Sequence, residues 1–358
     1  MRAAVIGGGA FGCSSAIALA KEGIQVDLFE TASTLLGGAS ANSHNRLHLG
    51  YHYLRSQETA RQSITGFLSF MFEFGESVVT GFPNYYALSR YNSLTTSEEF
   101  TNFCDSVGIS YREEFPKDEY LNRDQISGCF RVPEPLVNME SLALTLASKM
   151  KYLRVNVMLS TKAVNIFREF GKFRLITSSN PSGSHYDIVV DATYSNNRWL
   201  EDGLGIIPTP KHYEYVVIPE ISWEARSPVG LTVMDGDFAS VMPSASMAKR
   251  ALVYHVKESV VAGPWGEHPP PPYRDISDKE VKRIISKSSH FFPFLEFAET
   301  LAIRKAVRVV QENDVDARLS SVTSYPDIPG YASVFSGKIS TCVITGEHLV
   351  RAVVGSVV

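Results

Sequence analysis

The beginning of this sequence carries three glycines in a pattern that suits phosphate binding. Gly7, Gly9 and Gly12 occupy the glycine positions of a GxGxxG motif, between an apolar run and a helical stretch of small residues. Such a turn lets the backbone approach a pyrophosphate, and the first amides of the following helix carry partial positive charge. Glu30 stands 18 residues after Gly12, where a carboxylate can accept hydrogen bonds from a ribose. We therefore predict a dinucleotide-binding βαβ unit over residues 2–30.

Three histidines form a second candidate group. His44, His48 and His52 recur every four residues, which on a helix would place three imidazoles on one face, as in a metal site. Gly50 interrupts the run, and no carboxylate stands at ligand spacing. We therefore predict no metal at these histidines.

Two arginines are candidates for holding an anionic substrate group. Arg304 and Arg308 lie on one predicted strand, and a guanidinium can hold a carboxylate through two parallel hydrogen bonds. The alternative for either is an ordinary surface charge. Tyr213 and Tyr215 flank Glu214 on another predicted strand, where tyrosines line a pocket or pack in the core.

Hydrophobic periodicity predicts the elements that must position these residues. Strands are expected at 3–6, 25–30, 154–160, 163–169, 172–178, 185–193, 214–219, 229–234, 239–242, 250–256, 304–311 and 331–335. Helices are expected at 11–21, 56–82, 139–152, 277–289 and 293–299, and from about 338 to 353. Residues 85–136 show short elements alternating with turns, and four prolines at 269–272 predict a loop.

This order predicts an α/β fold: a Rossmann-like nucleotide-binding domain with an inserted domain built on a mixed or antiparallel sheet. We assign residues 1–80, 140–205 and 325–358 to the first domain. The substrate domain then gathers residues 81–139 and 206–324.

Composition narrows the class of protein. The 358 residues are 44% hydrophobic and 20% charged, and the formal net charge of −4 provides no basic excess for nucleic acid. Four scattered cysteines favour neither a disulfide framework nor a zinc site. No apolar stretch approaches the ~20 residues of a membrane span, and no secretory signal pattern is present. A cytoplasmic location is expected, and the oligomeric state is left open.

A second glycine-rich segment, LGGASAN at residues 36–42, follows the acidic strand end. With it the chain resembles the D-amino acid oxidase-like family of FAD-dependent oxidoreductases, which includes glycine oxidase and glycerol-3-phosphate dehydrogenase relatives. RLHLGYHY at 46–53, DIVVDAT at 187–193 and residues 330–341 are similar to further family segments. LAIR at 301–304 departs from the family's glycine–x–arginine–proline pattern.

The resemblance implies FAD as the cofactor. The contacts that it implies are Gly7, Gly9, Ala10, Phe11, Gly12, Glu30, Thr31, Gly38, Ala39, Ser40, Asn42, Arg46, Leu47, His48, Val164, Ala192, Thr193, Gly337, Lys338, Ile339, Ser340 and Thr341. The glycine and helix after residue 336 would place amide donors near the flavin, where negative charge accumulates on reduction.

The resemblance also implies a reaction. We expect a hydride to pass to FAD from a C–H bond next to an amine on a small substrate, with O2 or another carrier reoxidising the flavin. The expected catalytic residues are His48, Tyr51 and Arg304, and the expected substrate contacts are Tyr53, Tyr215, Arg304 and Arg308.

Three alternatives remain. His48 can act as the base that oxidation of a 2-hydroxy acid or another alcohol needs, or it can merely pack against the cofactor. The chain can be a non-catalytic or electron-relaying FAD subunit of a complex. A nicotinamide-only dehydrogenase would leave the two later glycine segments unexplained.

Overall fold

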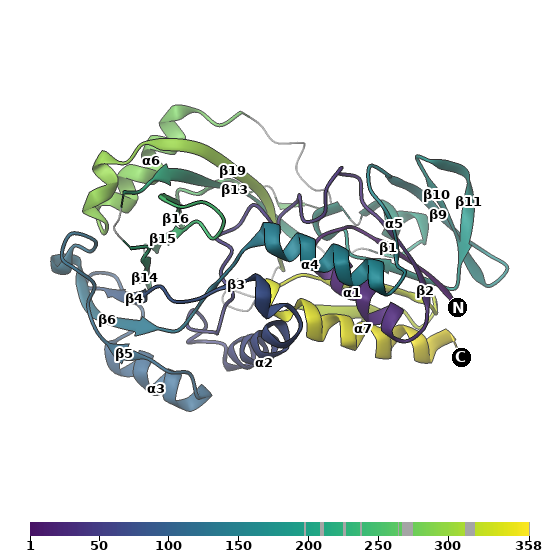
Figure 1. Cartoon of the computed structure of the whole chain (residues 1–358), viewed down its shortest axis with the longest axis horizontal. Helices are drawn as coiled ribbons and strands as arrows, with labels where there is room; N and C mark the ends of the chain where they lie inside the picture. Colours follow the sequence, from purple (N-terminus) through teal and green to yellow (C-terminus); the bar gives the residue numbers. More distant parts are fainter. Residues whose placement is uncertain are drawn as a thin grey trace.

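The computed structural model describes residues 1–196, 198–207, 211–224, 227–236, 238–263, 265–266, 275–311 and 319–357. Two large sheets organise the chain, each with its own helices (Figure 1). The predicted α/β class, with a nucleotide-binding fold and a second sheet domain, is confirmed. The domain boundaries themselves remain a prediction, and the proline run at 269–272 lies outside the described residues.

The first sheet has six strands and begins with the N-terminal βαβ unit. Its order is β20 (Ser321–Ser324), β21 (Tyr331–Phe335), β12 (Ile188–Asp191), β1 (Arg2–Ile6), β2 (Gln25–Phe29) and β8 (Asn156–Met158). All neighbours are parallel except β20 and β21. Strand β1 is therefore central, which agrees with its apolar sequence because such strands are buried on both faces.

Successive residues of β1 pack on opposite sides of this sheet. Ala3 and Val5 join the core formed with α1 (Ala10–Lys21), α4 (Met139–Tyr152) and α7 (Cys342–Val357). Ala4 and Ile6 pack on the other side, against a three-stranded antiparallel layer. That layer consists of β9 (Ala163–Glu169), β10 (Lys172–Thr177) and β11 (Asn180–Tyr186), with α5 (Arg198–Gly203) beside it.

The second sheet has ten strands and is mixed. Its main order is β17 (Val260–Ala262), β13 (Lys211–Ser222), β16 (Arg250–His255), β15 (Ala239–Pro243), β14 (Gly230–Met234), β4 (Asn84–Ser89), β6 (Ile126–Val132) and β5 (Arg112–Glu113). Strands β18 (Trp265–Gly266) and β19 (Thr300–Gln311) also pair with β13. Among the described residues of this sheet, β14 and β4 are the one parallel pair. Helix α6 (Asp278–Ser289) and the 3₁₀ turn η4 (Pro293–Phe297) cover the outer face, as Figure 1 shows.

Several helices differ from the sequence prediction. The helix expected at 293–299 is the 3₁₀ turn η4, and the final helix begins at Cys342, after the 3₁₀ turn η5 (Ile339–Thr341). Helix α2 (Gln57–Phe74) ends earlier than expected and continues into the 3₁₀ turn η1 (Gly75–Ser77) and the short β3 (Val78–Val79), which pairs with β7 (Leu136–Val137). Helix α3 (Ser97–Val107) was not predicted. It begins at a capping box in which Thr96 and Glu99 satisfy each other's backbone N–H groups.

In the part of the chain that the structure describes, no helix is both long and apolar enough to cross a bilayer.

Candidate functional site

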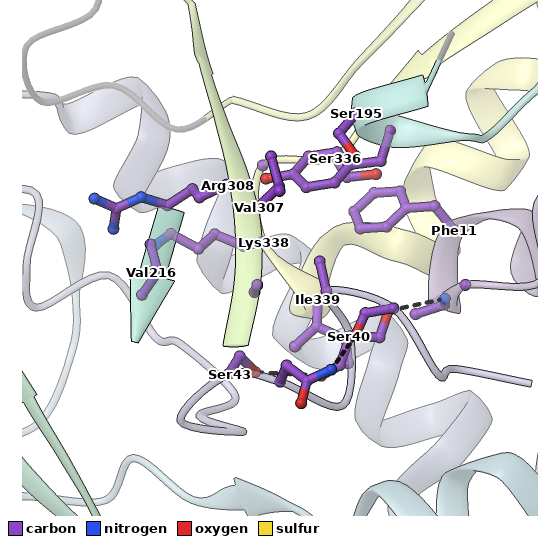
Figure 2. Close-up of a pocket in the computed structure, with 18 of the residues that line it drawn as sticks. Phe11, Ser40, Ser43, Ser195, Val216, Val307, Arg308, Ser336, Lys338 and Ile339 are labelled. Atoms are coloured by element: carbon purple, nitrogen blue, oxygen red, sulfur yellow. Dashed lines mark hydrogen bonds between the residues drawn. The ribbon is translucent and has the colours of Figure 1, made fainter. Parts of the chain in front are cut away.

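A cavity of about 1170 Å³ lies between the two sheets. Figure 2 shows Arg308 and Lys338 on one side of it and Phe11 and Ser40 on the other. The predicted cofactor contacts that line it are Gly7, Gly9, Ala10, Phe11, Glu30, Thr31, Gly38, Ala39, Ser40, Asn42, Arg46, His48, Ala192, Thr193, Gly337, Lys338 and Ile339. Most of the expected positions therefore meet at one site.

The glycine turn is shaped by close backbone approaches. Gly7 has a φ of +110°, and a Cβ there would lie 2.5 Å from the carbonyl oxygen of Ala192. Gly9 precedes the first residue of α1, so the unpaired amides of that helix lie at the cavity. The Oγ of Ser40 accepts a hydrogen bond from the Ala10 amide at 3.3 Å. The second glycine-rich segment is therefore held against the first turn.

Glu30 is fixed at the end of β2. One carboxylate oxygen accepts the amide of Gly8 at 2.6 Å, and the other accepts the amide of Ala32 at 2.7 Å. Both bonds are charge-assisted, so they hold the carboxylate where it lines the cavity.

The segment after β21 closes another side of the cavity. Gly337 donates its amide to the Oγ of Ser320 at 2.8 Å, and Ser320 also contacts the Oγ1 of Thr341 at 2.6 Å. Gly337, Lys338 and Ile339 line the cavity, whereas Ser340 and Thr341 are buried behind it.

Several predicted residues lie outside the cavity lining. Gly12 packs inside α1 and Leu47 is in the core. Val164 is half exposed, and its neighbour Ala163 lines the cavity instead. Tyr51 is buried and donates to the carbonyl of Ser110 at 2.5 Å. Tyr215 is buried too, while Tyr53 does line the cavity.

The two predicted anchoring arginines both have acidic partners. Arg304 bonds Glu220 through Nε and Nη2 and the carbonyl of Ala41 through Nη1, and it lies outside the cavity lining. Arg308 lines the cavity, but its Nε lies 2.5 Å from a carboxylate oxygen of Glu214. A substrate carboxylate would therefore compete with an acidic side chain that is already bound at either arginine.

Two other cations line the cavity. Arg46 is 4% exposed, and its Nε and Nη2 have no hydrogen-bond partner among the described residues. The Nζ of Lys338 lies 5.1 Å from the ring centre of Tyr53. Burial, the larger cause, and the Arg46 charge together lower the pKa of Lys338 to about 8. Arg46 and Lys338 can together attract an anionic group into the cavity.

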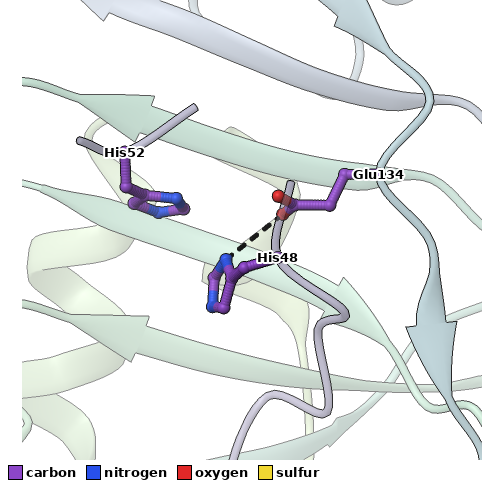
Figure 3. Close-up of side chains that lie close together, drawn as sticks. All are labelled: His48, His52 and Glu134. Atoms are coloured by element: carbon purple, nitrogen blue, oxygen red, sulfur yellow. Dashed lines mark ion pairs between the residues drawn. The ribbon is translucent and has the colours of Figure 1, made fainter. Parts of the chain in front are cut away.

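His48 lies beside these cations and next to a buried acid. Its Nδ1 is 3.6 Å from a carboxylate oxygen of Glu134 (Figure 3). Burial is the largest influence on its pKa, which falls to about 4, with Lys338 contributing in the same direction and Glu134 opposing. His48 is therefore a neutral imidazole at neutral pH, as a general base must be.

Glu134, His48 and His52 also offer ligand atoms within 4.8 Å of one another. Glu134, from a distant segment of the chain, thus supplies the carboxylate that is missing from the sequence around the histidines. Its oxygens, however, accept from the Tyr86 hydroxyl at 2.8 Å and the Leu49 amide at 3.0 Å, and both nitrogens of His52 have close partners. A metal ion would have to displace these contacts.

The family model of FAD-dependent oxidoreductases named DAO matches residues 2–331. The chain belongs to this family. It is an FAD-dependent oxidoreductase with the predicted D-amino acid oxidase-like fold.

Named relatives agree with this assignment. The FAD-dependent monooxygenase FPY4 of Fusarium mangiferae is 29% identical over 240 residues, 67% of this chain and 60% of that protein. The FAD-dependent monooxygenase kojA of Aspergillus flavus is 25% identical, with coverage of 98% and 85%. The glycine oxidase of Geobacillus kaustophilus is 18% identical and superposes with a TM-score of 0.73, covering 98% of this chain and 94% of that one. This last likeness concerns the fold.

The cavity has what FAD requires. It offers helix amides and a close-approach glycine for the pyrophosphate, and a fixed carboxylate at Glu30. Sequence reasoning did not find Tyr86 or Glu134. The one local signal for Glu134 is an acid between Pro133 and Pro135, which marks an irregular segment without indicating burial.

Proposed function

We propose that this chain oxidises a C–H bond next to an amine on a small substrate that carries an anionic group. When bound, FAD supplies the two-electron acceptor for that bond. The observation that carries the proposal is His48, a neutral imidazole that lines the same cavity as Gly337 and Lys338.

The protein's own residues would bind, orient and deprotonate the substrate. We assign the amide of Gly9, at the N-terminus of α1, to the pyrophosphate and Glu30 to the adenosine ribose. Arg46 and Lys338 then offer positive charge to the substrate's anionic group. His48 takes a proton from the substrate ammonium, so that the nitrogen lone pair assists departure of the hydride and a C=N bond forms.

The walls of the substrate chamber favour a compact, partly apolar molecule. Val216, Ile218 and Tyr254 line it from the large sheet, with Met234 and Phe238 nearby. Apolar walls exclude water from the C–H bond that breaks, which strengthens the electrostatic contacts around it.

Oxidation of a 2-hydroxy acid or another alcohol is the second candidate. It is favoured by the carboxylate beside His48, because removal of a hydroxyl proton needs a stronger base than removal of an ammonium proton. In that case a C=O bond forms instead of C=N, and the rest of the site works unchanged.

Anaerobic reduction tests both candidates. The purified FAD-loaded protein would be mixed with a panel of amines and amino acids and, separately, with 2-hydroxy acids and alcohols. Loss of the visible flavin band with nitrogen compounds alone supports the proposal, and loss with hydroxy compounds alone supports the alternative. A flavin that reacts with neither class, yet is reduced by dithionite, would favour the non-catalytic subunit.

The electron acceptor needs its own measurement. Both curated relatives are named monooxygenases, so we propose O2. Turnover in isotopically labelled O2 distinguishes release of hydrogen peroxide from transfer of an oxygen atom to the product.

A further inference from the structure

The segment that carries Arg46 and His48 is tied to the segment that carries Glu134 by strand-like pairing. Leu47 donates its amide to the carbonyl of Pro135 at 3.0 Å, and Arg46 forms an antiparallel bridge with Leu136. This pairing holds Glu134 beside the first turn after His48. Because the contact is made by backbone bonds, the distance between His48 and Glu134 is set by the fold.

The hydrogen bonds around Glu134 determine which ring nitrogen of His52 carries a proton and to which group the Tyr86 hydroxyl donates. The Nη1 of Arg46 can only donate, so the Nε2 of His52, 3.3 Å away, must accept. A neutral His52 then carries its proton on Nδ1 and donates to the Tyr86 hydroxyl at 2.8 Å. Tyr86 in turn donates to Glu134 at 2.8 Å.

Glu134 is therefore an acceptor on both oxygens. The Tyr86 hydroxyl donates a hydrogen bond to Oε1, and the amide of Leu49 donates one to Oε2. Burial alone would raise the pKa of the Glu134 carboxyl, but His48, the Arg46 charge and the Leu49 amide outweigh it and lower the pKa. The carboxylate stays ionised, and the Nδ1 of His48 faces it across 3.6 Å.

We propose that Glu134 is a positioning residue that holds His48 as the Nδ1–H tautomer, leaving the lone pair on Nε2 free to take the substrate proton. Figure 3 shows Nδ1 directed to Glu134 and the other ring nitrogen directed away from it. The catalytic part of this inference rests on the proposed function. The tautomer itself does not.

The proton transfer balances without a further reactant. The bond from the substrate's N or O to its proton breaks, and a new N–H bond forms on Nε2 of His48. Glu134 stabilises the positive charge that appears on the ring, while the substrate's C–H bond breaks and its electron pair leaves as a hydride, for which bound FAD would be the acceptor. The groups that face His48 are Glu134, Arg46, Lys338, His44 and His52. Glu134 is the anion among them.

Glu134→Gln tests this assignment because it changes hydrogen bonding with little change of shape. The fixed Leu49 amide requires an acceptor, so the amide oxygen turns to it and the amide NH2 faces Tyr86 and His48. The Tyr86 hydroxyl can rotate to accept. The Nδ1 of His48 must then accept as well, which moves its proton to Nε2 and removes the lone pair from the cavity.

The first readout is the ¹⁵N spectrum of histidine-labelled, FAD-loaded protein at neutral pH, with His48→Asn identifying the His48 signals. We expect the Nδ1–H form in the unaltered protein and the Nε2–H form in Glu134→Gln. Glu113→Gln, at an exposed position on β5, serves as the matched control and leaves the spectrum unchanged. An Nε2–H form in the unaltered protein, or no change in Glu134→Gln, would overturn the inference.

The second readout is a double-mutant cycle on the rate of flavin reduction. If Glu134 acts through His48, Glu134→Gln slows reduction by about 100-fold, and adds almost nothing to His48→Asn. Additive losses would overturn the inference and indicate a merely structural role. If no substrate reduces the flavin, the proposed function fails while the spectrum still decides the tautomer.

Discussion

The carbonyl oxygen of Gly7 lies against the Cα of Gly12, so closely that a Cβ at position 12 would overlap it. The first turn of α1 and the end of β1 are therefore packed through two glycines with no side chain between them. The same added Cβ would lie 3.3 Å from the Cβ of Ala192, the residue after β12. It could therefore not shift away from Gly7 in that direction.

Gly12→Ala should abolish FAD binding. Neither the Gly7 carbonyl nor Ala192 can retreat, so the substitution should also destabilise the fold by about 3 kcal/mol or more. Visible absorbance and thermal unfolding of the purified variant measure both effects. Gly355→Ala in α7, where a Cβ meets open space, is the control and should leave both unchanged. A yellow Gly12→Ala protein of normal stability would contradict this account.

Glu30→Gln should weaken FAD binding by about 10- to 100-fold, because bonds of the charged carboxylate to two amides are each worth about 1.5–3 kcal/mol. The dissociation constant can be measured by fluorescence titration of the FAD-free protein. Glu22→Gln removes an exposed carboxylate at the C-terminal end of α1, away from the cavity lining, so its affinity for FAD should match that of the unaltered protein.

Binding of an anionic substrate should weaken as the pH rises through about 8. The pKa of Lys338 is lowered to about that value, first by burial and then by Arg46, so its positive charge is present below pH 8 and lost above it. KM should therefore rise above pH 8 in the unaltered protein. In Lys338→Met it should be high at every pH, and a profile that still bends at pH 8 in that variant would assign the titration to another group.

Asp191→Asn should stabilise the protein at neutral pH. Burial raises the pKa of Asp191 to about 6, against hydrogen bonds from Thr193 that lower it. The folded state thus binds more protons than the unfolded state between about pH 4 and 6, so this group's contribution to stability falls as the pH rises through that window. Removing the ionisation should add up to about 3 kcal/mol at pH 7 and almost nothing at pH 4. Urea unfolding at the two pH values measures the difference.

The βαβ unit was predictable because its signals are local. A strand, a turn, a helix and an acid within residues 2–30 fix one another's positions through short connections. It was harder to predict which residues of β9 face the cavity. Residues of a strand alternate between its faces, so Ala163 lines the cavity while the side chain of its neighbour Val164, the predicted cofactor contact, is half exposed.

The arginine prediction shows what local reasoning lacks. Arg304 and Arg308 do share a strand, but β13 pairs with β19 in a register that places Glu214 opposite Arg308. Glu220 reaches Arg304 from the same strand. Which acid meets which arginine depends on the register between the two strands. The spacing of residues within either strand does not reveal that register.

Glu134, the acid beside His48, could not be predicted from the sequence for a similar reason. Glu134 lies 86 residues after His48, and it is buried only because residues 45–47 pair with residues 135–137. Tyr86, which orients it, comes from a third segment, β4.

The central position of β1 has a consequence for synthesis on the ribosome. Its neighbour β12 is translated some 180 residues later, and β21, with the glycine segment that closes the cavity, some 330 residues later. The glycine turn therefore emerges first and must wait, with its apolar strand unpaired on one side, until nearly all of this sequence has left the exit tunnel. Flavin capture is consequently a late event in the life of the nascent chain.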